Sequence, residues 1–260
     1  LREEQKPAAD ALLKNDIGVL SATTAFGKTV IASYIISQRK VNTLVLVHTQ
    51  ALMKQWQKSL EEFLTINISP TEYKGKGRRK KWSPVGTLGG GTNSLNGTVD
   101  VAVMQSLFDG DEVKALVRNY GMIIVDECHH VSAVNFERVL KYADAKYVYG
   151  LTATPTRQDG HHPIIFMQCG MICYRVDAKS QAEKHSFEHY IIPRFTTFRD
   201  VSLYESTITQ VYKSLAESES RNSLIVSDVN ASLECGKTPI ILTERKEHVL
   251  SLAQALQLYC

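Results

Sequence analysis

The sequence predicts an α/β protein built on a doubly wound, mostly parallel sheet. Continuous apolar runs of strand length recur along the chain, as at Thr43–His48 and Met122–Val125. Helix-periodic segments alternate with these runs, the order expected when crossover helices join parallel strands. Polar or charged residues follow the carboxyl end of each run. Because ligands of such sheets bind at that edge, we expect the functional residues there.

The first predicted element is a helix that begins near Arg2. Its apolar residues fall at helical spacing: Ala8, Ala9, Leu12 and Leu13. The separation between Gln5 and Lys28 leaves room for one helix and one strand, so Gln5 could lie beside a ligand of the next loop. Spacing alone favours the plainer interpretation, an ordinary polar residue at a helix start.

A phosphate-binding loop is predicted between the next strand and helix. Ile17–Leu20 leads into a short loop, and Gly27-Lys28-Thr29 opens an apolar helical run. Backbone N–H groups and the positive end of the helix dipole converge on an anion in this arrangement. Lys28 would reach the β- and γ-phosphates, and the Thr29 hydroxyl would bind Mg²⁺. The candidate nucleotide contacts of the loop are Thr24, Ala25, Gly27, Lys28, Thr29 and Val30.

Two alanines depart from the usual glycine pattern of such loops. Ala22 stands five residues before Gly27, where the first glycine is usual, and Ala25 stands where many loops carry a second. Alanine resists positive φ angles. We therefore expect the loop either to avoid left-handed angles at both positions or to carry strain there.

A buried strand over Thr43–His48 is followed by a predicted helix that starts at Thr49-Gln50. The apolar residues at helical spacing are Leu52, Trp56, Leu60 and Phe63. We expect Trp56 to belong to the core rather than to a ligand site. A further strand is predicted over Val99–Val103 and ends at Met104-Gln105-Ser106-Leu107.

A strongly basic segment lies between those two strands. Lys74–Trp82 reads Lys-Gly-Lys-Gly-Arg-Arg-Lys-Lys-Trp, with six cations before the tryptophan. Two interpretations stay open. One is a solvated surface loop, and the other is contact with a phosphodiester backbone, which glycine-spaced cations beside an aromatic ring also suit. The Gly-, Ser- and Asn-rich stretch from Ser83 to Gly97 is expected to continue as loop.

Two adjacent carboxylates follow the apolar strand Met122–Val125. Phosphoryl transfer needs two such groups, and we expect Asp126 to hold Mg²⁺ and Glu127 to orient and deprotonate water. A surface Asp-Glu pair at the start of a turn is the plainer alternative. It is disfavoured because four apolar residues lead into the pair and a phosphate loop precedes it.

Tyr147–Thr154 is predicted as one more buried strand that ends in hydroxyl groups. Thr152 and Thr154 could hydrogen-bond near a γ-phosphate and transmit its presence. Taken alone, the stretch would be a strand end followed by a proline turn. Ala178–Arg199 is interpreted as a closing strand and linker, and the segment from Tyr204 to about Leu233 as helical.

The end of the chain is predicted to hold one more strand and one more helix, over Pro239–Thr243 and Glu244–Leu258. Together they would form a single α/β unit of a second domain. One such unit cannot bury a sheet of its own.

Composition is that of an ordinary globular protein. The chain has 260 residues, of which 43% are hydrophobic and 22% charged, with a net charge of +3. That length allows one large domain or two smaller ones.

No apolar run reaches membrane-spanning length and no signal peptide is visible. Five scattered cysteines suggest a reducing compartment, so we expect a cytoplasmic or nucleoid-associated protein. Because the sequence starts at Leu1, we expect a segment of a longer protein.

In order along the chain, these motifs resemble those of superfamily 2 helicases of the DExH group. The residues that carry the resemblance are Ala22–Thr29 for motif I, Thr49-Gln50 for motif Ia, Asp126-Glu127-Cys128-His129 for motif II and Thr152-Ala153-Thr154 for motif III. Arg2 and Gln5 match an upstream element that reads adenine, which favours a nucleotide contact for Gln5 more than spacing does.

One stretch is most similar to the XPB-like and type I/III restriction-subunit branches of that superfamily, namely Gly150–Gly160. XPB-like enzymes carry an Arg-Glu-Asp element near this position. Here the sequence is Arg157-Gln158-Asp159, and the glutamine puts a DNA-distorting role of that element in doubt.

The resemblance implies a RecA-like, ATP-binding lobe over residues 1–200, and linker helices with the start of a second RecA-like lobe over residues 201–260. It implies ATP and Mg²⁺ as cofactors. Coupling residues would be His129, Thr152 and Thr154, and nucleic-acid contacts would be Thr49, Gln50, Arg78, Arg79, Lys80, Lys81, Gln105, Ser106 and Arg157. The later motifs of the second lobe, with its arginine finger, are absent from this sequence, so we expect the isolated chain to hydrolyse ATP poorly.

The expected function is an ATP-dependent helicase or translocase that acts on nucleic acid, DNA rather than RNA. Nuclease or primase modules in the parent protein would fit, and no membrane partner is expected. Two alternatives stay open, an ATP-gated clamp that closes on nucleic acid without travelling and a small-molecule P-loop NTPase or kinase. Thr152-Ala153-Thr154 and the basic segment argue against the kinase, but sequence does not separate the clamp from the motor.

Overall fold

The computed structural model describes residues 1–68, 82–128, 133–153, 162–176, 190–199 and 207–257. Contacts between residues divide the chain into two compact units, Leu1–Ser186 and Phe187–Cys260. The predicted sheet lies in the first unit.

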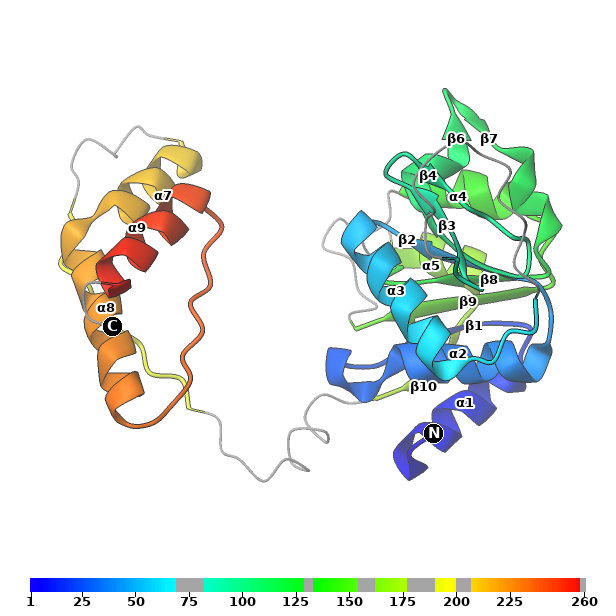
Figure 1. The fold of residues 1–260 in the computed structure, drawn as a ribbon, viewed down its shortest axis with the longest axis horizontal. Helices are drawn as coiled ribbons and strands as arrows, with labels where there is room; N and C mark the ends of the chain where they lie inside the picture. Colours follow the sequence, from blue (N-terminus) through cyan, green and yellow to red (C-terminus); the bar gives the residue numbers. More distant parts are fainter. Residues whose placement is uncertain (69–81, 129–132, 154–161, 177–189, 200–206, 258–260) are drawn as a thin grey trace. The chain divides into compact units, whose positions relative to one another are not determined.

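A mostly parallel sheet forms the centre of the first unit (Figure 1). Within the described residues it has eight strands in the order β10-β1-β9-β8-β2-β5-β3-β4. All neighbours run parallel except β3 and β4. The strands are β1 (Ile17–Ser21), β2 (Thr43–Val47), β3 (Gly86–Gly89), β4 (Thr92–Asn93), β5 (Val99–Val103), β8 (Met122–Val125), β9 (Tyr147–Thr152) and β10 (Ile172–Arg175). The prediction of a doubly wound parallel sheet is confirmed.

Helices cover both faces of this sheet. They are α1 (Lys6–Leu13), α2 (Lys28–Arg39), α3 (Gln50–Phe63), α4 (Ala133–Tyr142) and α5 (His162–Cys169), and a separate hairpin is formed by β6 (Phe108–Asp109) and β7 (Glu112–Val113). Side chains of α1, α2 and α3 pack with Val45 and Val47 of β2, whereas α4 and α5 belong to the cluster that holds Leu44 and Leu46. Because strand side chains alternate between faces, a continuous apolar run supplies both cores.

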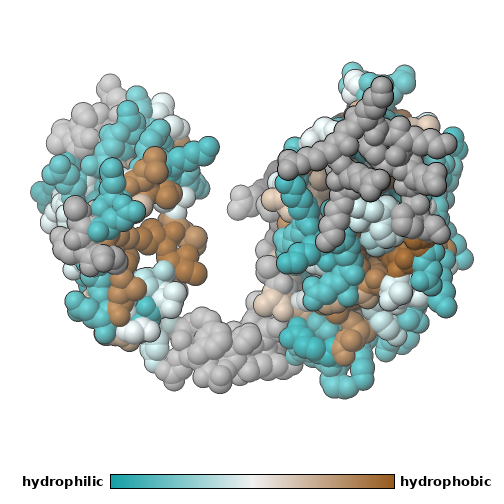
Figure 2. Space-filling model, in the orientation of Figure 1, coloured by the Kyte–Doolittle hydropathy of each residue, from teal (hydrophilic) through white to brown (hydrophobic). Residues whose placement is uncertain are grey.

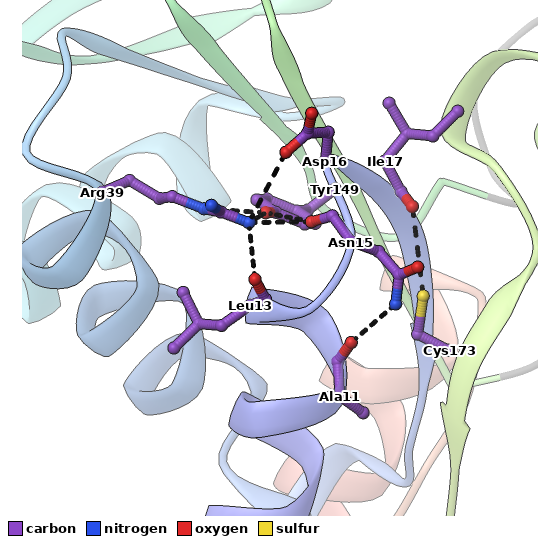
Figure 3. A network of polar contacts seen from close by, with 8 residues as sticks. All are labelled: Ala11, Leu13, Asn15, Asp16, Ile17, Arg39, Tyr149 and Cys173. Carbon is purple, nitrogen blue, oxygen red and sulfur yellow. Dashed lines mark hydrogen bonds and ion pairs between the residues drawn. The ribbon is translucent and has the colours of Figure 1, made fainter.

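A polar network ties α1, α2 and β9 together at the opposite edge of the sheet from the predicted site (Figure 3). The Arg39 guanidinium donates to the carbonyls of Leu13 and Asn15 at 2.9 and 2.8 Å, and its Nη2 lies 2.7 Å from the Tyr149 hydroxyl. That hydroxyl donates to the Asn15 carbonyl at 2.8 Å. Arg39 also lies over the Tyr147 ring, 4.1 Å from its centroid. The network therefore closes the turn between α1 and β1.

Two sequence expectations in the first unit are wrong in part. The stretch Ser83–Gly97, expected as loop, contains the buried strand β3, which pairs with β5, and the short strand β4. The edge strand beside β1 is β10, over Ile172–Arg175, ahead of the predicted range that starts at Ala178. Residues 177–189 of that range lie outside the described residues, and 190–199 form no strand.

The second unit is helical over its described residues, with α7 (Ile208–Glu217), α8 (Glu219–Glu234) and α9 (Lys246–Gln257). The single helical pattern predicted here is broken at Ser218, whose side chain caps α8. The strand predicted over Pro239–Thr243 does not form. Ile240 and Leu242 are 83% and 90% exposed. Figure 2 shows hydrophobic residues on the surface of this unit. An apolar segment forms a strand only where neighbouring strands offer hydrogen bonds, and the described part of this unit has none.

Candidate active site

The sheet order places the predicted site residues along one edge, the carboxyl ends of the strands. The phosphate loop follows β1, Thr152 ends β9 and Asp126 follows β8. The neighbouring strands β2 and β5 are followed by the predicted nucleic-acid contacts Thr49 and Gln105. One half of this edge, at β1, β9 and β8, thus carries the candidate nucleotide-site residues. The adjoining half, at β2 and β5, carries the candidate nucleic-acid contacts.

The loop between β1 and α2 avoids strain at its two alanines. Among the residues that the structure describes, only Lys40 and Glu127 are non-glycine residues with positive φ, so neither Ala22 nor Ala25 is left-handed. The left-handed residue of the loop is Gly27, with φ +89°. A Cβ added at Gly27 would lie 2.5 Å from Nε2 of Gln5. The positive φ angle favours glycine there, and a Cβ would also push the Gln5 amide from its present position.

Lys28 opens α2 and is only 6% exposed. Its Nζ donates to the Ala22 carbonyl at 3.2 Å and lies 3.4 Å from Oε1 of Glu127. The ammonium group is therefore held over the loop, beside the first turn of a helix whose dipole also favours an anion.

Asp126 is a buried carboxylate with a donor on each oxygen. Nε1 of Trp56 donates to Oδ2 at 2.6 Å, and the backbone N–H of Glu127 donates to Oδ1 at 3.1 Å. Burial raises the pKa of Asp126 above its ordinary value, while the Trp56 hydrogen bond acts in the opposite direction. Sequence spacing placed Trp56 in the core, and its 2% exposure agrees, but spacing gave no sign of the bond to Asp126.

Glu127 adopts a left-handed backbone conformation, with φ +45°. Non-glycine residues pay roughly 1–2 kcal/mol for this region, and such outliers concentrate at functional sites. The next residue, Cys128, donates its backbone N–H to Leu151 of β9 at 3.1 Å. Burial, followed by the charge of Glu127, raises the pKa of the Cys128 thiol to about 12, so Cys128 is a neutral core residue.

Arg2 and Gln5 bind the phosphate loop directly. The Gln5 amide and the Arg2 guanidinium both donate to the Phe26 carbonyl, at 2.7 and 2.8 Å. Oε1 of Gln5 accepts from the backbone N–H of Arg2 at 2.8 Å. A primary amide has two donor hydrogens and two acceptor lone pairs, so these two bonds use one of each, and the Gln5 side chain is only 2% exposed.

These residues fit a magnesium nucleotide. Gly27 gives a close backbone approach, Lys28 supplies a buried cation, and Asp126 supplies a buried carboxylate oriented by two donors. Within the described ranges, no cluster of three or more His, Cys, Asp or Glu residues could hold a metal by itself. A Mg²⁺ ion here would therefore need phosphate oxygens and water as further ligands, as is usual for this ion.

The half of the edge formed by β2 and β5 carries polar groups, which lie at the start of α3 and directly after β5. Thr49 caps α3 by accepting from the Leu52 N–H at 3.2 Å, and Thr49, Gln50 and Gln105 are exposed. Ser106 lines a shallow pocket of about 290 Å³ together with Lys114, whose Nζ donates to the Ser106 carbonyl at 3.0 Å.

Sequence reasoning missed a lysine and a run of three glycines in this half. Lys114 carried no motif, and the glycines at positions 89–91 were treated as loop. A Cβ added at Gly90 would lie 2.5 Å from the Gln50 side chain, so the run of glycines was the available signal of a close approach.

Several predicted residues lie outside the described residues: Arg78, Arg79, Lys80, Lys81, His129, Thr154 and Arg157, together with the side chain of Thr24. Thr29 and Val30 lie in the first turn of α2 and are partly exposed. Thr152 is fully buried, and its carbonyl accepts from the Ala22 N–H at 2.9 Å. In the described part of the chain, no helix has both the length and the apolar character needed to cross a membrane.

Comparison with known proteins gives consistent matches. Residues 1–157 match the family described as type III restriction enzyme, res subunit. The DNA 3'-5' translocase XPB2 of Sulfurisphaera tokodaii is 30% identical over 191 residues, which is 74% of this chain and 39% of that protein. Putative helicase 161L of Invertebrate iridescent virus 6 is 26% identical across 100% of this chain and 56% of its own length. The chain thus spans about half or less of these relatives.

Among solved structures, the Hef helicase domain of Pyrococcus furiosus is similar to this chain with a TM-score of 0.55. The two are 18% identical, and the match covers 99% of this chain and 53% of that one. At this identity the likeness concerns the fold, which is RecA-like.

Proposed function

This chain belongs to the superfamily 2 helicases, in the branch of XPB-like enzymes and type III restriction enzyme res subunits, and on that premise we propose that it is the nucleotide-binding part of an ATP-driven motor that moves along or unwinds DNA. One observation carries the proposal. Lys28 and Glu127 meet at 3.4 Å beside Asp126, on the same edge of the sheet that presents Thr49 and Gln105.

The nucleotide would be held by groups already converging on the loop. Lys28 and the first turn of α2 would bind the β- and γ-phosphates, and Gln5 would meet the adenine. Thr29 and Asp126 would hold Mg²⁺, which when bound neutralises phosphate charge during phosphoryl transfer. Val30, Ala25 and Thr24 complete the proposed contacts.

Glu127 is the proposed general base for hydrolysis. It would take a proton from the attacking water while the bond between the γ-phosphorus and the bridging oxygen breaks, which releases ADP and phosphate. Its carboxylate lies 3.4 Å from the Lys28 ammonium group. Phosphate oxygens would compete for Lys28, and that competition would release Glu127 toward water.

The DNA assignment rests on the relatives and on charge. The S. tokodaii relative is named as a DNA translocase, and the segment Lys74–Lys81 holds six cations, which suit a phosphodiester backbone. The proposed contacts are Thr49, Gln50, Gln105, Ser106, Arg157 and the basic segment, to which we add Lys114. Thr152, Thr154 and His129 would couple the nucleotide site to these nucleic-acid contacts.

The remaining parts of the proposal concern the whole protein. We place the first lobe over residues 1–200 and the start of a second over residues 201–260, in a reducing, cytoplasmic or nucleoid-associated setting, with nuclease or primase modules compatible with the parent. Helicase-type sites lie between two lobes, and an arginine finger is worth about 10³–10⁵ in rate. Because this sequence carries no later second-lobe motif, the isolated chain should bind ATP weakly and hydrolyse it slowly.

The test is steady-state ATPase activity of the full-length parent, with single-stranded DNA, duplex DNA and RNA compared at one salt concentration. Stimulation by DNA above RNA supports the proposal. Hydrolysis that ignores nucleic acid and responds to a small molecule favours the NTPase or kinase. If DNA stimulates hydrolysis but the protein neither separates the strands of a duplex nor displaces a third strand bound along a duplex, the result favours the ATP-gated clamp.

A further inference from the structure

Trp56 connects α3 with the carboxylate of Asp126. Its indole N–H donates to Oδ2 at 2.6 Å, and both residues are almost fully buried, with 2% and 7% exposure. The other oxygen, Oδ1, accepts from the backbone N–H of Glu127. Trp56 is thus the side chain, 70 residues away in sequence, that fixes the rotation of this carboxylate.

The main chain of Asp126 is fixed separately, through the sheet. Its backbone N–H donates to the Leu46 carbonyl of β2 at 2.9 Å, which continues the parallel pairing of β8 with β2. A movement of α3 relative to the sheet would therefore shift the indole while the backbone of Asp126 stays in place. Such a movement changes the orientation of the carboxylate alone.

The same helix begins at the candidate nucleic-acid edge. Thr49 caps α3, and Gln50 is its first residue. From Thr49 to Trp56 is two helical turns, a rise of about 10 Å. A contact on the first turn of α3 and the Asp126 carboxylate are therefore joined by one short, rigid element.

We propose that Trp56 is a positioning residue that sets Asp126 for Mg²⁺ and transmits occupancy of the first turn of α3 by nucleic acid to the metal site. The inference rests on the proposed function, which supplies both ligands. Hydrogen bonds behind a metal ligand typically change metal affinity by about 10–100-fold when they are removed, which gives the size of effect to look for.

Trp56 also packs in the core of α1, α2 and α3, so a structural role must be separated from a positioning one. Trp56→Phe keeps an aromatic ring in the core and removes the N–H donor. Leu60→Val is the matched control, because Leu60 lies one turn further along the same buried face of α3 and contributes packing only.

The first measurement is equilibrium binding of a fluorescent ATP analogue as Mg²⁺ is titrated. In Trp56→Phe the half-saturating Mg²⁺ concentration should rise about 10-fold, while binding without Mg²⁺ and thermal stability follow the Leu60→Val control. Equal Mg²⁺ dependence in wild type and Trp56→Phe would overturn the inference. So would a loss that Leu60→Val reproduces. If the wild type binds no nucleotide at all, the proposed function fails instead.

The second measurement uses intrinsic fluorescence, because the chain has only two tryptophans. In Trp82→Phe the remaining emission comes from Trp56. Addition of a single-stranded DNA oligonucleotide without nucleotide should change that emission, and Mg²⁺ with ADP should change it again. DNA that binds, by anisotropy of a labelled oligonucleotide, without altering Trp56 emission would show that α3 does not transmit its occupancy.

Discussion

Lys28 and Glu127 form an ion pair of 3.4 Å across the candidate site, although one residue opens the helix after β1 and the other follows β8. Their side chains are 7% and 20% exposed, so the pair is largely screened from water. The ion pair therefore joins the residue proposed to bind phosphate, Lys28, to the residue proposed as the general base, Glu127.

Glu127→Gln should separate binding from hydrolysis. The amide keeps the shape of the side chain and removes the negative partner of Lys28, so nucleotide affinity should stay the same or rise. Turnover in the parent protein should fall by about 10²-fold or more, as expected for loss of a general base, whereas Lys28→Ala should weaken nucleotide binding itself. Glu137→Gln, on α4 and paired with Lys141, is the control. Wild-type turnover in Glu127→Gln would exclude Glu127 as the base.

Gln5→Ala should weaken nucleotide binding and reduce the preference for ATP over GTP. The Gln5 amide donates one hydrogen to the Phe26 carbonyl, and in the proposed site its other donor and a lone pair would bind the base. Loss of the hydrogen bond to the loop should affect both nucleotides, and loss of the hydrogen bonds to the base should affect ATP alone. The measurement is competition of each nucleotide against a fluorescent analogue, with Lys6→Ala as an exposed control. Equal losses for ATP and GTP would limit Gln5 to positioning the loop.

Neutralising Arg78, Arg79, Lys80 and Lys81 should weaken DNA binding by similar factors across sequences. It should also flatten the dependence of log K on log salt, by about one unit of slope for each phosphate that the variant no longer neutralises. Lys40→Gln, after the far end of α2, is the control for loss of a single positive charge outside the segment. A salt slope that does not change in the quadruple variant would return the segment to the solvated-loop interpretation.

The central strands were predictable because their signal is local. Ile123 and Ile124 of β8 face opposite cores, so an uninterrupted apolar run was sufficient to place that strand, and Asp126 and Glu127 after it. Helical spacing likewise placed Trp56 on the buried face of α3. It could not give the direction of the indole N–H, which depends on how α3 packs on the sheet beside Asp126.

The sequence did not predict strand β3, because its first residue, Gly86, makes room for a residue of another strand, Asp100. Gly86 lies opposite Asp100 in the pairing with β5, and a Cβ added at Gly86 would lie 1.9 Å from the Asp100 carboxylate. That carboxylate is fully buried and accepts from the Tyr120 hydroxyl at 2.7 Å. A glycine that makes space for a buried charge has the same appearance in sequence as a glycine in a loop.

Arg39→Ala should destabilise the first unit without affecting nucleotide affinity. The side chain is 17% exposed and donates to Leu13, Asn15 and Tyr149 (Figure 3). Charged hydrogen bonds of this kind contribute about 1.5–3 kcal/mol, so we expect a loss of about 2–3 kcal/mol in chemical denaturation. Arg118→Ala removes an exposed ion pair with Asp144 and should cost much less, because water screens exposed ion pairs. Similar losses in the two variants would contradict the role of the network.

His248 should make the stability of the second unit depend on pH. The side chain is buried between α8 and the 239–243 segment, with Nδ1 2.9 Å from the Thr243 hydroxyl and Nε2 3.0 Å from Oδ1 of Asn222. A neutral ring satisfies both partners when Nε2 donates and Nδ1 accepts. Burial, followed by the charge of Arg221, lowers the pKa of His248 from its ordinary value of 6.5.

A lowered pKa means that the unfolded chain binds the proton more readily than the folded one. Stability is therefore complete above pH 6.5, the ordinary value, and is lost as pH falls from there through the lowered pKa. His248→Gln retains a donor for Asn222 and cannot titrate. As pH falls through that interval, wild type should therefore lose stability, and the free energy of unfolding of His248→Gln minus that of wild type should increase. Chemical denaturation at a series of pH values measures the difference. A difference that stays constant with pH, or that moves in favour of wild type as pH falls, would mean that the folded unit accommodates the charged ring, and the neutral hydrogen-bonding scheme would then be wrong.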